Sequence, residues 1–174
     1  LWRHYSKVYA FLTRAPEYQN MIKTIVNMVA PHLPDFSARV LNLGAGTGAA
    51  EIGFLESFGL GRFERFEMVE VNPHMQNEAK RIFSDIFEDT SSFVYNRSSI
   101  QDIRYSGKFD AVISSLAITF LPDRDTLTSS LLKAHSMLSK GSPVAHVVHK
   151  KDFNPPAIAA GYCSDVLLGA RGGL

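Results

Sequence analysis

The residue types and spacing that indicate chemistry begin with the segment Asn42-Leu43-Gly44-Ala45-Gly46-Thr47-Gly48. Glycine lets the backbone turn sharply and lets a ligand approach the main chain without meeting a Cβ atom. A helix that starts directly after such a turn begins with unpaired N–H groups. Tight strand-to-helix turns also use glycine for steric reasons alone. The segment therefore indicates a ligand loop only if a second feature supports it.

The second feature is Glu70, which follows Gly48 by 22 positions at the end of an apolar run. In nucleotide-binding α/β folds, an acidic side chain at the end of the second strand accepts hydrogen bonds from ribose hydroxyls. The alternative is an ion pair with Lys80 or Arg81, since an unpaired carboxylate is costly to bury. Together the loop and Glu70 favour an adenosine-type ligand at the carboxyl edge of a sheet.

The elements that must position these residues alternate along the middle of the chain, which is typical of an α/β protein with a parallel sheet. Asn72-Pro73 gives a strong helix start signal, an N-cap followed by proline. Asp123 or Asp125 is expected to cap the last helix. The expected strands are 39–43, 66–71, 92–95, 109–114 and 143–148, and the expected helices are 17–30, 49–58, one from 73 to about 87, and one from 123 or 125 to 140.

The loop by itself leaves the ligand open. Gly44-Ala45-Gly46-Thr47-Gly48-Ala49 also satisfies the dinucleotide pattern G-x-G-x-x-G/A, so an NAD(P)-binding Rossmann oxidoreductase is one alternative.

Five segments in order resemble the class I S-adenosylmethionine-dependent methyltransferases, the Rossmann-like methyltransferase superfamily. Residues 40–48 resemble the first motif of that family, a hydrophobic strand followed by G-x-G-x-G. The other segments resemble the acidic turn after the second strand, the adenine loop with the F-D-x-V start of the fourth strand, the segment after that strand, and the turn before the fifth. They are 70–75, 98–112, 114–123 and 138–142.

The resemblance implies an α/β, three-layer Rossmann-like methyltransferase fold with a mostly parallel sheet, and S-adenosyl-L-methionine as cofactor. It assigns the glycine loop to the methionine end of the cofactor, Glu70 to the ribose hydroxyls and Val71 to the adenine face. The implied cofactor-binding residues are Asn42, Gly44, Ala45, Gly46, Gly48, Glu70, Val71, Ser99, Ile100 and Ser115.

Three places depart from the family pattern, and at one of them Ser142 and Pro143 blur the usual P-G-G turn. Asn42 stands where the family usually has Asp or Glu, and Ser99 stands where it often has an aspartate for the adenine amino group. Asn42 brings no charge, so we expect weaker retention of the ammonium end. These departures leave a catalytically inactive, methyltransferase-like binding domain as a second alternative.

The implied reaction is an in-line displacement at the methyl group, which positioning alone can accelerate. His149, after the last expected strand, is the candidate general base, although a solvent-facing histidine is the commoner situation. His146 and His135 are expected to be core histidines with satisfied hydrogen bonds, and His74 to be exposed. Tyr5 and Tyr9 lie in an N-terminal segment that often covers the cofactor in the family, although ordinary packing of an amphipathic helix explains them equally well.

The acceptor is predicted by elimination. The (D/N)-P-P-(Y/F) segment of amino-directed methyltransferases of adenine or glutamine is replaced by Ser114-Ser115-Leu116-Ala117, and Asn154-Pro155-Pro156 is read as a loop. There is no basic stripe that would indicate a nucleic acid, and no His/Cys spacing that would indicate a metal. The sequence therefore predicts a small-molecule acceptor.

Length and composition set the frame. The chain has 174 residues, is 45% hydrophobic and 20% charged, and has a net charge of +1, values typical of one globular domain. One cysteine, Cys163, and the lack of a long apolar run favour a cytoplasmic protein without a membrane span.

We expect a single methyltransferase domain over 1–174, with an N-terminal helical cap at 1–38, a cofactor-binding core at 39–150 and an incomplete segment at 151–174. The family sheet has seven strands, but only 24 residues follow Lys150, and they contain no clear strand pair. The last strands of the fold are therefore expected to be missing.

Overall fold

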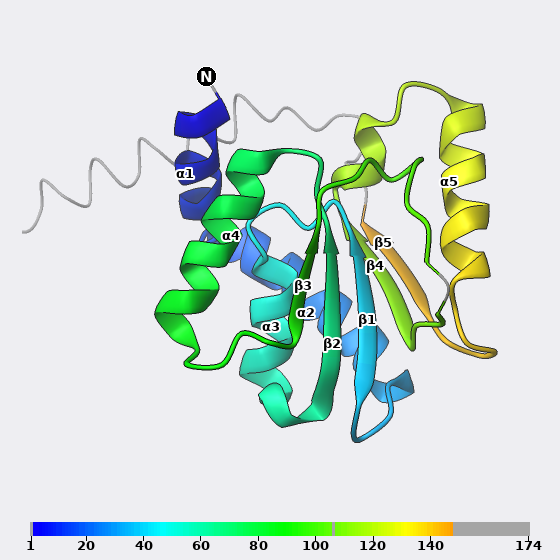
Figure 1. Cartoon of the computed structure of the whole chain (residues 1–174), viewed down its shortest axis with the longest axis horizontal. Coiled ribbons are helices and arrows are strands. Elements are labelled where there is room, and N and C mark those ends of the chain that lie inside the picture. Colours follow the sequence, from blue (N-terminus) through cyan, green and yellow to red (C-terminus); the bar gives the residue numbers. More distant parts are fainter. Residues whose placement is uncertain (1, 106, 148–174) are drawn as a thin grey trace, which may run out of the picture.

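The computed structural model describes residues 2–105 and 107–147, which form a parallel β-sheet with helices on both faces (Figure 1). In chain order, the helices, short 3-10 turns (η) and strands are α1 (Trp2–Leu12), α2 (Pro16–Val29), η1 (Ala30–His32), β1 (Ala38–Leu43), α3 (Ala49–Phe58), η2 (Leu60–Arg62), β2 (Phe63–Val69), α4 (Pro73–Ile86), β3 (Phe93–Asn96), β4 (Ala111–Ser115), η3 (Ala117–Phe120), α5 (Arg124–Ser136) and β5 (Val144–Val147).

The described strands form one five-stranded sheet in the order β3-β2-β1-β4-β5, and every pair is parallel. The chain moves outward from β1 to β3 and then crosses to β4 on the other side of β1. This reversal places a topological switch point between the carboxyl ends of β1 and β4, where open α/β sheets bind ligands. The loops after these two strands therefore lie where this fold holds ligands.

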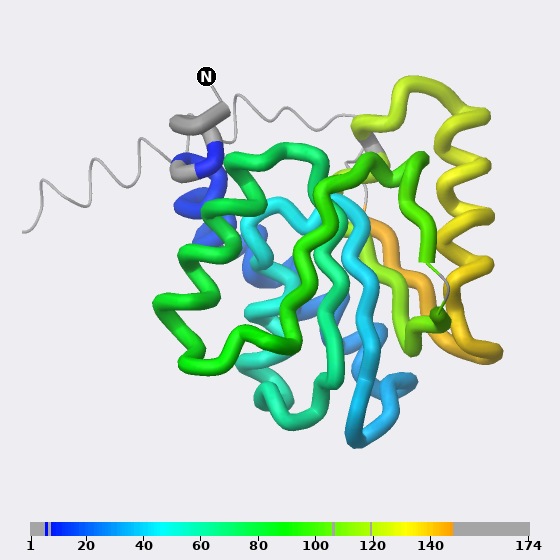
Figure 2. Tube along the Cα trace, viewed as in Figure 1, coloured from blue at the N-terminus to red at the C-terminus, as the bar shows by residue number. Residues whose placement is uncertain are grey.

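Two apolar clusters cover the two faces of the sheet. One cluster joins α2, α3 and α4 to one face, with Phe54, Phe66 and Phe83 among its fully buried side chains. The other joins α5 to the opposite face through Leu41, Val112 and neighbours. Figure 2 shows the same three layers, with the yellow α5 on the side opposite α3 and α4. The fold is thus the expected three-layer, Rossmann-like arrangement.

Capping side chains fix where the helices of the core begin. Asn72 Oδ1 accepts a hydrogen bond from His74 N at 2.9 Å and starts α4. Asp123 Oδ1 accepts one from Thr126 N at 2.7 Å and starts α5, so Asp123 is the cap of the two expected aspartates. This hydrogen bond to the ionised form lowers the pKa of the Asp123 carboxyl.

Some expected boundaries are wrong. β2 starts at Phe63 rather than at position 66, because Phe63 already pairs with Ala38 of β1. β2 also ends at Val69, before Glu70. Phe109 lies before β4 and makes only an isolated bridge with Leu138.

The expectation that the last strands of the fold are missing concerns the end of the chain, and residues 148–174 lie outside the described residues. None of the helices in the described part of the chain is both long and apolar enough to cross a membrane.

Candidate functional site

The glycine loop between β1 and α3 requires glycine at three positions. Gly44, Gly46 and Gly48 have φ values of +74°, +58° and +86°, in the left-handed region that side chains rarely adopt. A Cβ on Gly44 would lie 2.1 Å from Cβ of Ala117, and one on Gly48 would lie 2.5 Å from Phe83 Cε2. The glycines therefore bring the loop against η3 and α4, whatever ligand it holds.

Backbone hydrogen bonds hold the loop over the end of β2. The N–H groups of Gly44 and Ala45 both donate to Val69 O, at 2.8 and 2.9 Å. Gly48 N–H donates to Ala45 O at 3.0 Å, which closes the turn before α3. These backbone hydrogen bonds fix the conformation of the loop.

Glu70 joins this loop to the turn after β2. Its Oε2 accepts a hydrogen bond from Gly46 N at 2.9 Å, and its Oε1 accepts one from Asn72 N at 2.8 Å. The side chain is part-buried, and each carboxylate oxygen keeps a second acceptor position. The structure thus holds the Glu70 carboxylate beside the glycine loop at the carboxyl edge of the sheet, as the sequence predicts.

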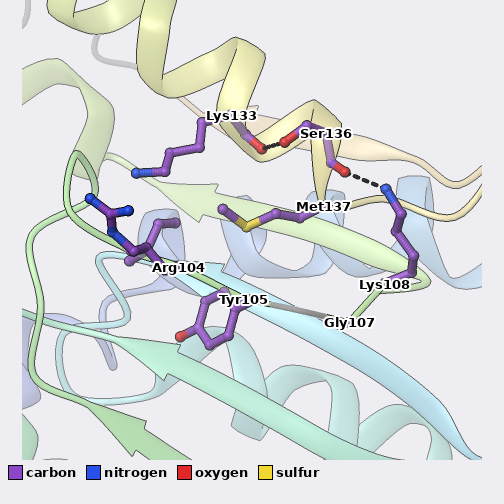
Figure 3. A pocket seen from close by; sticks show the side chains of 8 residues that line it. Arg104, Tyr105, Gly107, Lys108, Lys133, Ser136 and Met137 are labelled. Carbon is purple, nitrogen blue, oxygen red and sulfur yellow. Dashed lines mark hydrogen bonds between the residues drawn. The ribbon is translucent and has the colours of Figure 1, made fainter.

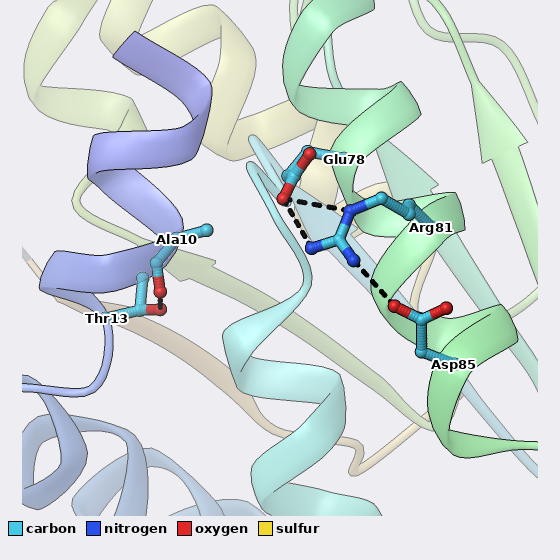
Figure 4. Close-up of polar contacts among 5 residues, drawn as sticks. All are labelled: Ala10, Thr13, Glu78, Arg81 and Asp85. Carbon is cyan, nitrogen blue, oxygen red and sulfur yellow. Dashed lines mark hydrogen bonds and ion pairs between the residues drawn. The ribbon is translucent and has the colours of Figure 1, made fainter. Parts of the chain in front are cut away.

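The alternative ion pair of Glu70 is absent among the described residues. Arg81 instead binds Glu78 at 2.8 Å and Asp85 at 2.6 Å along α4 (Figure 4). Nζ of Lys80 lies 5.0 Å from the ring centroid of Tyr95. Glu70 is therefore not explained as the partner of a cation on α4.

Three further predicted residues lie around the same edge. The Val71 side chain directly after Glu70 is 62% exposed and so is open to a ligand. Ser99 Oγ donates to Asp102 Oδ2 at 2.5 Å, so the loop after β3 presents a carboxylate that the sequence reasoning missed. Ile100 is nine-tenths buried in the second core cluster and can offer a ligand only its edge.

The turn after β4 completes the edge at the switch point. Leu116 has φ +64°, a rare conformation for a branched residue, and its N–H donates to Val147 O at 2.9 Å. This strained turn places Ala117 against Gly44. The Ser115 side chain instead points toward α2, where its Oγ lies 3.9 Å from Sδ of Met21.

A buried polar pair lies directly behind the loop. Asn42 Nδ2 donates to Glu51 Oε1 at 2.8 Å, and both side chains are almost completely buried. Burial raises the pKa of the Glu51 carboxyl to about 7, and the hydrogen bond from Asn42 offsets part of this rise. Glu51 was missed because a glutamate in the first turn of a helix is ordinarily a solvated residue that favours the helix dipole.

Helix α1 approaches the loop from the outside. A Cβ on Gly46 would lie 3.4 Å from Cε1 of Tyr9, and the Tyr9 and Tyr18 hydroxyls lie 2.9 Å apart. Tyr9 therefore lies beside Gly46 and packs on Tyr18 of α2, and its role in a segment that covers the cofactor stays a prediction. The side chain of Tyr5 lies outside the described residues.

The histidine predictions have mixed outcomes. His149 lies outside the described residues. His74 is exposed, as expected, but His135 is exposed too and is not a core residue. Both ring nitrogens of His146 are buried without a hydrogen-bond partner among the described residues, so the prediction that its hydrogen bonds are satisfied is wrong. Burial lowers the pKa of this imidazole.

Two surface cavities lie away from this edge. One, of about 380 Å³, lies near the C-terminal end of α5, where Lys108 Nζ donates to Ser136 O and so neutralises the helix terminus (Figure 3). The other, of about 470 Å³, lies between α1 and α4 and includes Phe11 and Arg81. Neither contains the glycine loop or Glu70.

Comparisons with known proteins give matches among solved structures. No family model matches the chain, and no curated protein matches it. DesVI of Streptomyces venezuelae superposes with a TM-score of 0.67 at 20% identity, over 86% of this chain and 60% of DesVI.

Two further structures contain the cofactor or its product. CalS10 of Micromonospora echinaspora, an amino pentose methyltransferase with S-adenosylmethionine bound, gives a TM-score of 0.64 at 20% identity, over 85% of this chain and 56% of CalS10. The N-methyltransferase NodS of Bradyrhizobium japonicum, with S-adenosylhomocysteine, gives 0.63 at 16% identity, over 76% and 62%. The chain thus spans only part of the length of these structures. At these identities the likeness shows the α/β Rossmann-like fold of such methyltransferases.

Proposed function

We propose that this chain, which has the fold of the class I S-adenosylmethionine-dependent methyltransferases, binds S-adenosyl-L-methionine and transfers its methyl group to a small-molecule acceptor. The single observation that carries the proposal is the position of Glu70. Its carboxylate is fixed by Gly46 N and Asn72 N at the carboxyl edge, with acceptor positions left for two hydroxyl donors. A ribose diol is such a pair of donors.

The glycine loop fits the methionine end of this cofactor. Gly46 leaves the main chain without a side chain on the side that faces Tyr9, whereas Gly44 and Gly48 allow the close approach of Ala117 and Phe83. Asn42 is neutral and buried behind the loop, so it supplies no charge to the ammonium group.

The adenine would lie between Val71 and the loop after β3. The exposed Val71 side chain offers an apolar contact for the ring, and Ile100 adds an apolar edge from below. The carboxylate of Asp102, held by Ser99 Oγ, is an acceptor suited to an exocyclic amino group. Asp102 thus supplies the charge that is absent at position 99.

Positioning is the main contribution that the described residues can make to the reaction. S-adenosylmethionine supplies an electrophilic methyl group on its sulfonium. The chain fixes the glycine loop and the turn at Leu116 on either side of the switch point, so an acceptor held there would lie in line with that methyl group. A general base is required only if the acceptor keeps its proton until it reacts, and His149 is kept as the candidate.

The fold neighbours favour a small polar acceptor, such as an amino sugar. CalS10 is an amino pentose methyltransferase, and a sugar N-methyltransferase, KedS8, is another neighbour, with a TM-score of 0.59 at 18% identity. Both are longer than this chain, which covers 56% and 55% of their length. We therefore assign the acceptor by class only.

Calorimetric titration with S-adenosylhomocysteine and with NADH tests the proposal. We expect S-adenosylhomocysteine to bind more tightly, and Glu70→Ala to weaken its binding by about 1–3 kcal/mol, the scale of hydrogen bonds to a charged group. Glu64→Ala is the matched control, because Glu64 is exposed near the other end of the same strand.

The outcomes separate the alternatives. Tighter binding of NADH would favour the oxidoreductase, and no binding of either ligand would favour the inactive domain. Equal affinities of the Glu70→Ala and Glu64→Ala variants would show that Glu70 has only a structural role.

A further inference from the structure

Glu51 is a carboxylate in a place where the structure offers it little compensation. It is 0% exposed, and none of the ion pairs among the described residues involves it. Its Oε1 accepts a side-chain hydrogen bond from a neutral amide, and the backbone N–H of Glu51 itself gives a smaller stabilisation of the ionised form, but Oε2 has no partner. Asn42 Oδ1 is likewise buried without a partner. A buried charge with one neutral partner is strongly disfavoured unless a positive charge comes near.

The position of Glu51 is close to where such a charge would be placed. Glu51 lies in the first turn of α3, three residues after Gly48, which is about 4.5 Å along the helix axis. Its partner Asn42 lies on β1, two residues before Gly44. The Asn42–Glu51 pair therefore contacts both elements that the glycine loop joins.

The surroundings contain few other groups that titrate. Burial and, second, the charge of Glu51 raise the pKa of the Tyr95 hydroxyl on β3 to about 12, and Lys80 of α4 lies over the Tyr95 ring. The core residues around them from α2, β2 and α4 are apolar and include Ile22, Met68 and Phe83. Glu51 is thus the group near the loop that can change charge around neutral pH.

We infer that Glu51 makes this site prefer the positively charged methyl donor over the neutral demethylated product, by losing its proton when the donor binds. The inference rests on the proposed function and deepens it. The donor carries a sulfonium, which attracts the ionised carboxylate, whereas the product carries a neutral thioether in the same place. The proton passes from Glu51 to solvent, and no other bond changes. After methyl transfer the sulfonium is gone, so Glu51 regains a proton and product release becomes easier.

The sign of the pH dependence follows from this linkage. Burial gives Glu51 a pKa of about 7 in the free protein, so below that pH the donor must displace a proton in order to bind. We expect the affinity ratio of S-adenosylmethionine to S-adenosylhomocysteine to be on the order of tenfold higher at pH 8 than at pH 6. Both ligands carry the same amine and carboxylate, so the ratio isolates the effect of the sulfonium.

Calorimetry of the whole chain in buffers of different ionisation enthalpy measures the proton directly. We expect S-adenosylmethionine to release a large fraction of one proton near pH 6.5, and S-adenosylhomocysteine to release far less. In Glu51→Gln, which keeps an acceptor for Asn42 Nδ2 but cannot ionise, the release and the pH dependence of the ratio should disappear. Glu56→Gln, on the exposed side of α3, is the matched control and should behave as the wild type.

A second variant keeps the test valid if Glu51→Gln folds poorly. Asn42→Asp places another carboxyl group beside Glu51, so the midpoint of the pH dependence should move to higher pH because two like charges resist ionising together. An equal pH dependence for the two ligands, or an unchanged profile in Glu51→Gln, would overturn the inference and leave the proposed function standing. Failure of both ligands to bind at any pH would overturn the proposed function and the inference with it.

Discussion

At the scale of single residues, the site is built from side chains that the fold leaves in costly places. Glu51 is buried with one neutral partner, and Leu116 keeps a left-handed backbone after β4. Features of this kind cluster at functional sites, where the surrounding structure compensates for their cost. Both lie beside the carboxyl edge, one at the start of α3 and one in the turn after β4.

The buried carboxyl of Glu51 predicts a stability that depends on pH. Because its pKa of about 7 in the folded chain is raised from 4.5, the folded state holds more protons than the unfolded state between these values. Stability should therefore fall as pH rises from 4.5 through 7. Glu51→Gln removes this term and should increase the free energy of unfolding at pH 8, relative to its effect at pH 4.5, by up to about 3 kcal/mol. Urea denaturation of wild type and variant at the two pH values measures it, and parallel pH curves would contradict it.

An alanine at Gly44 should destabilise the chain through a steric clash as well as backbone strain. A second glycine of positive φ without close neighbours separates the two costs. Gly44→Ala forces a side chain into a φ of +74° and places its Cβ 2.1 Å from that of Ala117. Gly141→Ala also forces a side chain into a positive φ, of +85°, but nothing lies within 4 Å of its Cβ. Gly141→Ala should cost about 1–2 kcal/mol, and Gly44→Ala clearly more, with loss of cofactor binding. Thermal unfolding and calorimetry compare them, and equal costs would show that the turn at Ala117 yields.

At the scale of elements, periodicity and capping were enough to predict most of the fold. All five strands and the four expected helices of the described chain are present, because alternating apolar runs and the Asn72-Pro73 start signal depend on local sequence. β2 was misplaced because Glu64 and Arg65 interrupt its apolar run, whereas pairing with β1 extends it to Phe63. Tertiary pairing of this kind leaves no local signal.

The errors within elements have similar causes. The expected core position of His135 depends on a helix that continues to residue 140, but α5 ends at Ser136 and its inward face is set by Leu131 and Ala134. His135 lies about 100° around the helix from Ala134. Asp102 was missed because its role depends on the fold of the loop after β3.

The N-cap of α4 predicts an effect on stability that is separate from binding. Asn72→Ala removes the hydrogen bond from His74 N to the side chain and should cost about 1 kcal/mol. The backbone N–H of residue 72 still donates to Glu70, so binding of S-adenosylhomocysteine should change much less than in Glu70→Ala. Asn77→Ala, at an exposed position within the same helix, should be neutral or slightly stabilising. Chemical denaturation measures all three variants, and an equal effect at 72 and 77 would contradict the cap.

At the scale of the whole molecule, the parallel sheet gives the chain two unlike edges. All five described strands end at the edge that holds the glycine loop, Glu70 and the turn at Leu116. The cavity near Lys108 and Ser136 lies at the other end of α5, toward the start of β4. A measurement that follows every amide of the chain can therefore show at which of the two edges a ligand binds.

Hydrogen exchange with and without excess S-adenosylhomocysteine makes this assignment. Amides that exchange by local opening should slow by about tenfold or more at 44–48, 70–72, 97–100 and 115–118, since opening these loops releases the ligand. Amides at 59–62, 88–92 and 107–110 open at the opposite edge without disturbing it, so their exchange should be unchanged. Slowing confined to 107–110 and the end of α5 would instead assign the ligand to the cavity near Lys108 and Ser136. The same experiment on Glu70→Ala at equal ligand concentration should show weaker protection in all four loops together, because one carboxylate holds the glycine loop and the turn after β2 in a single arrangement.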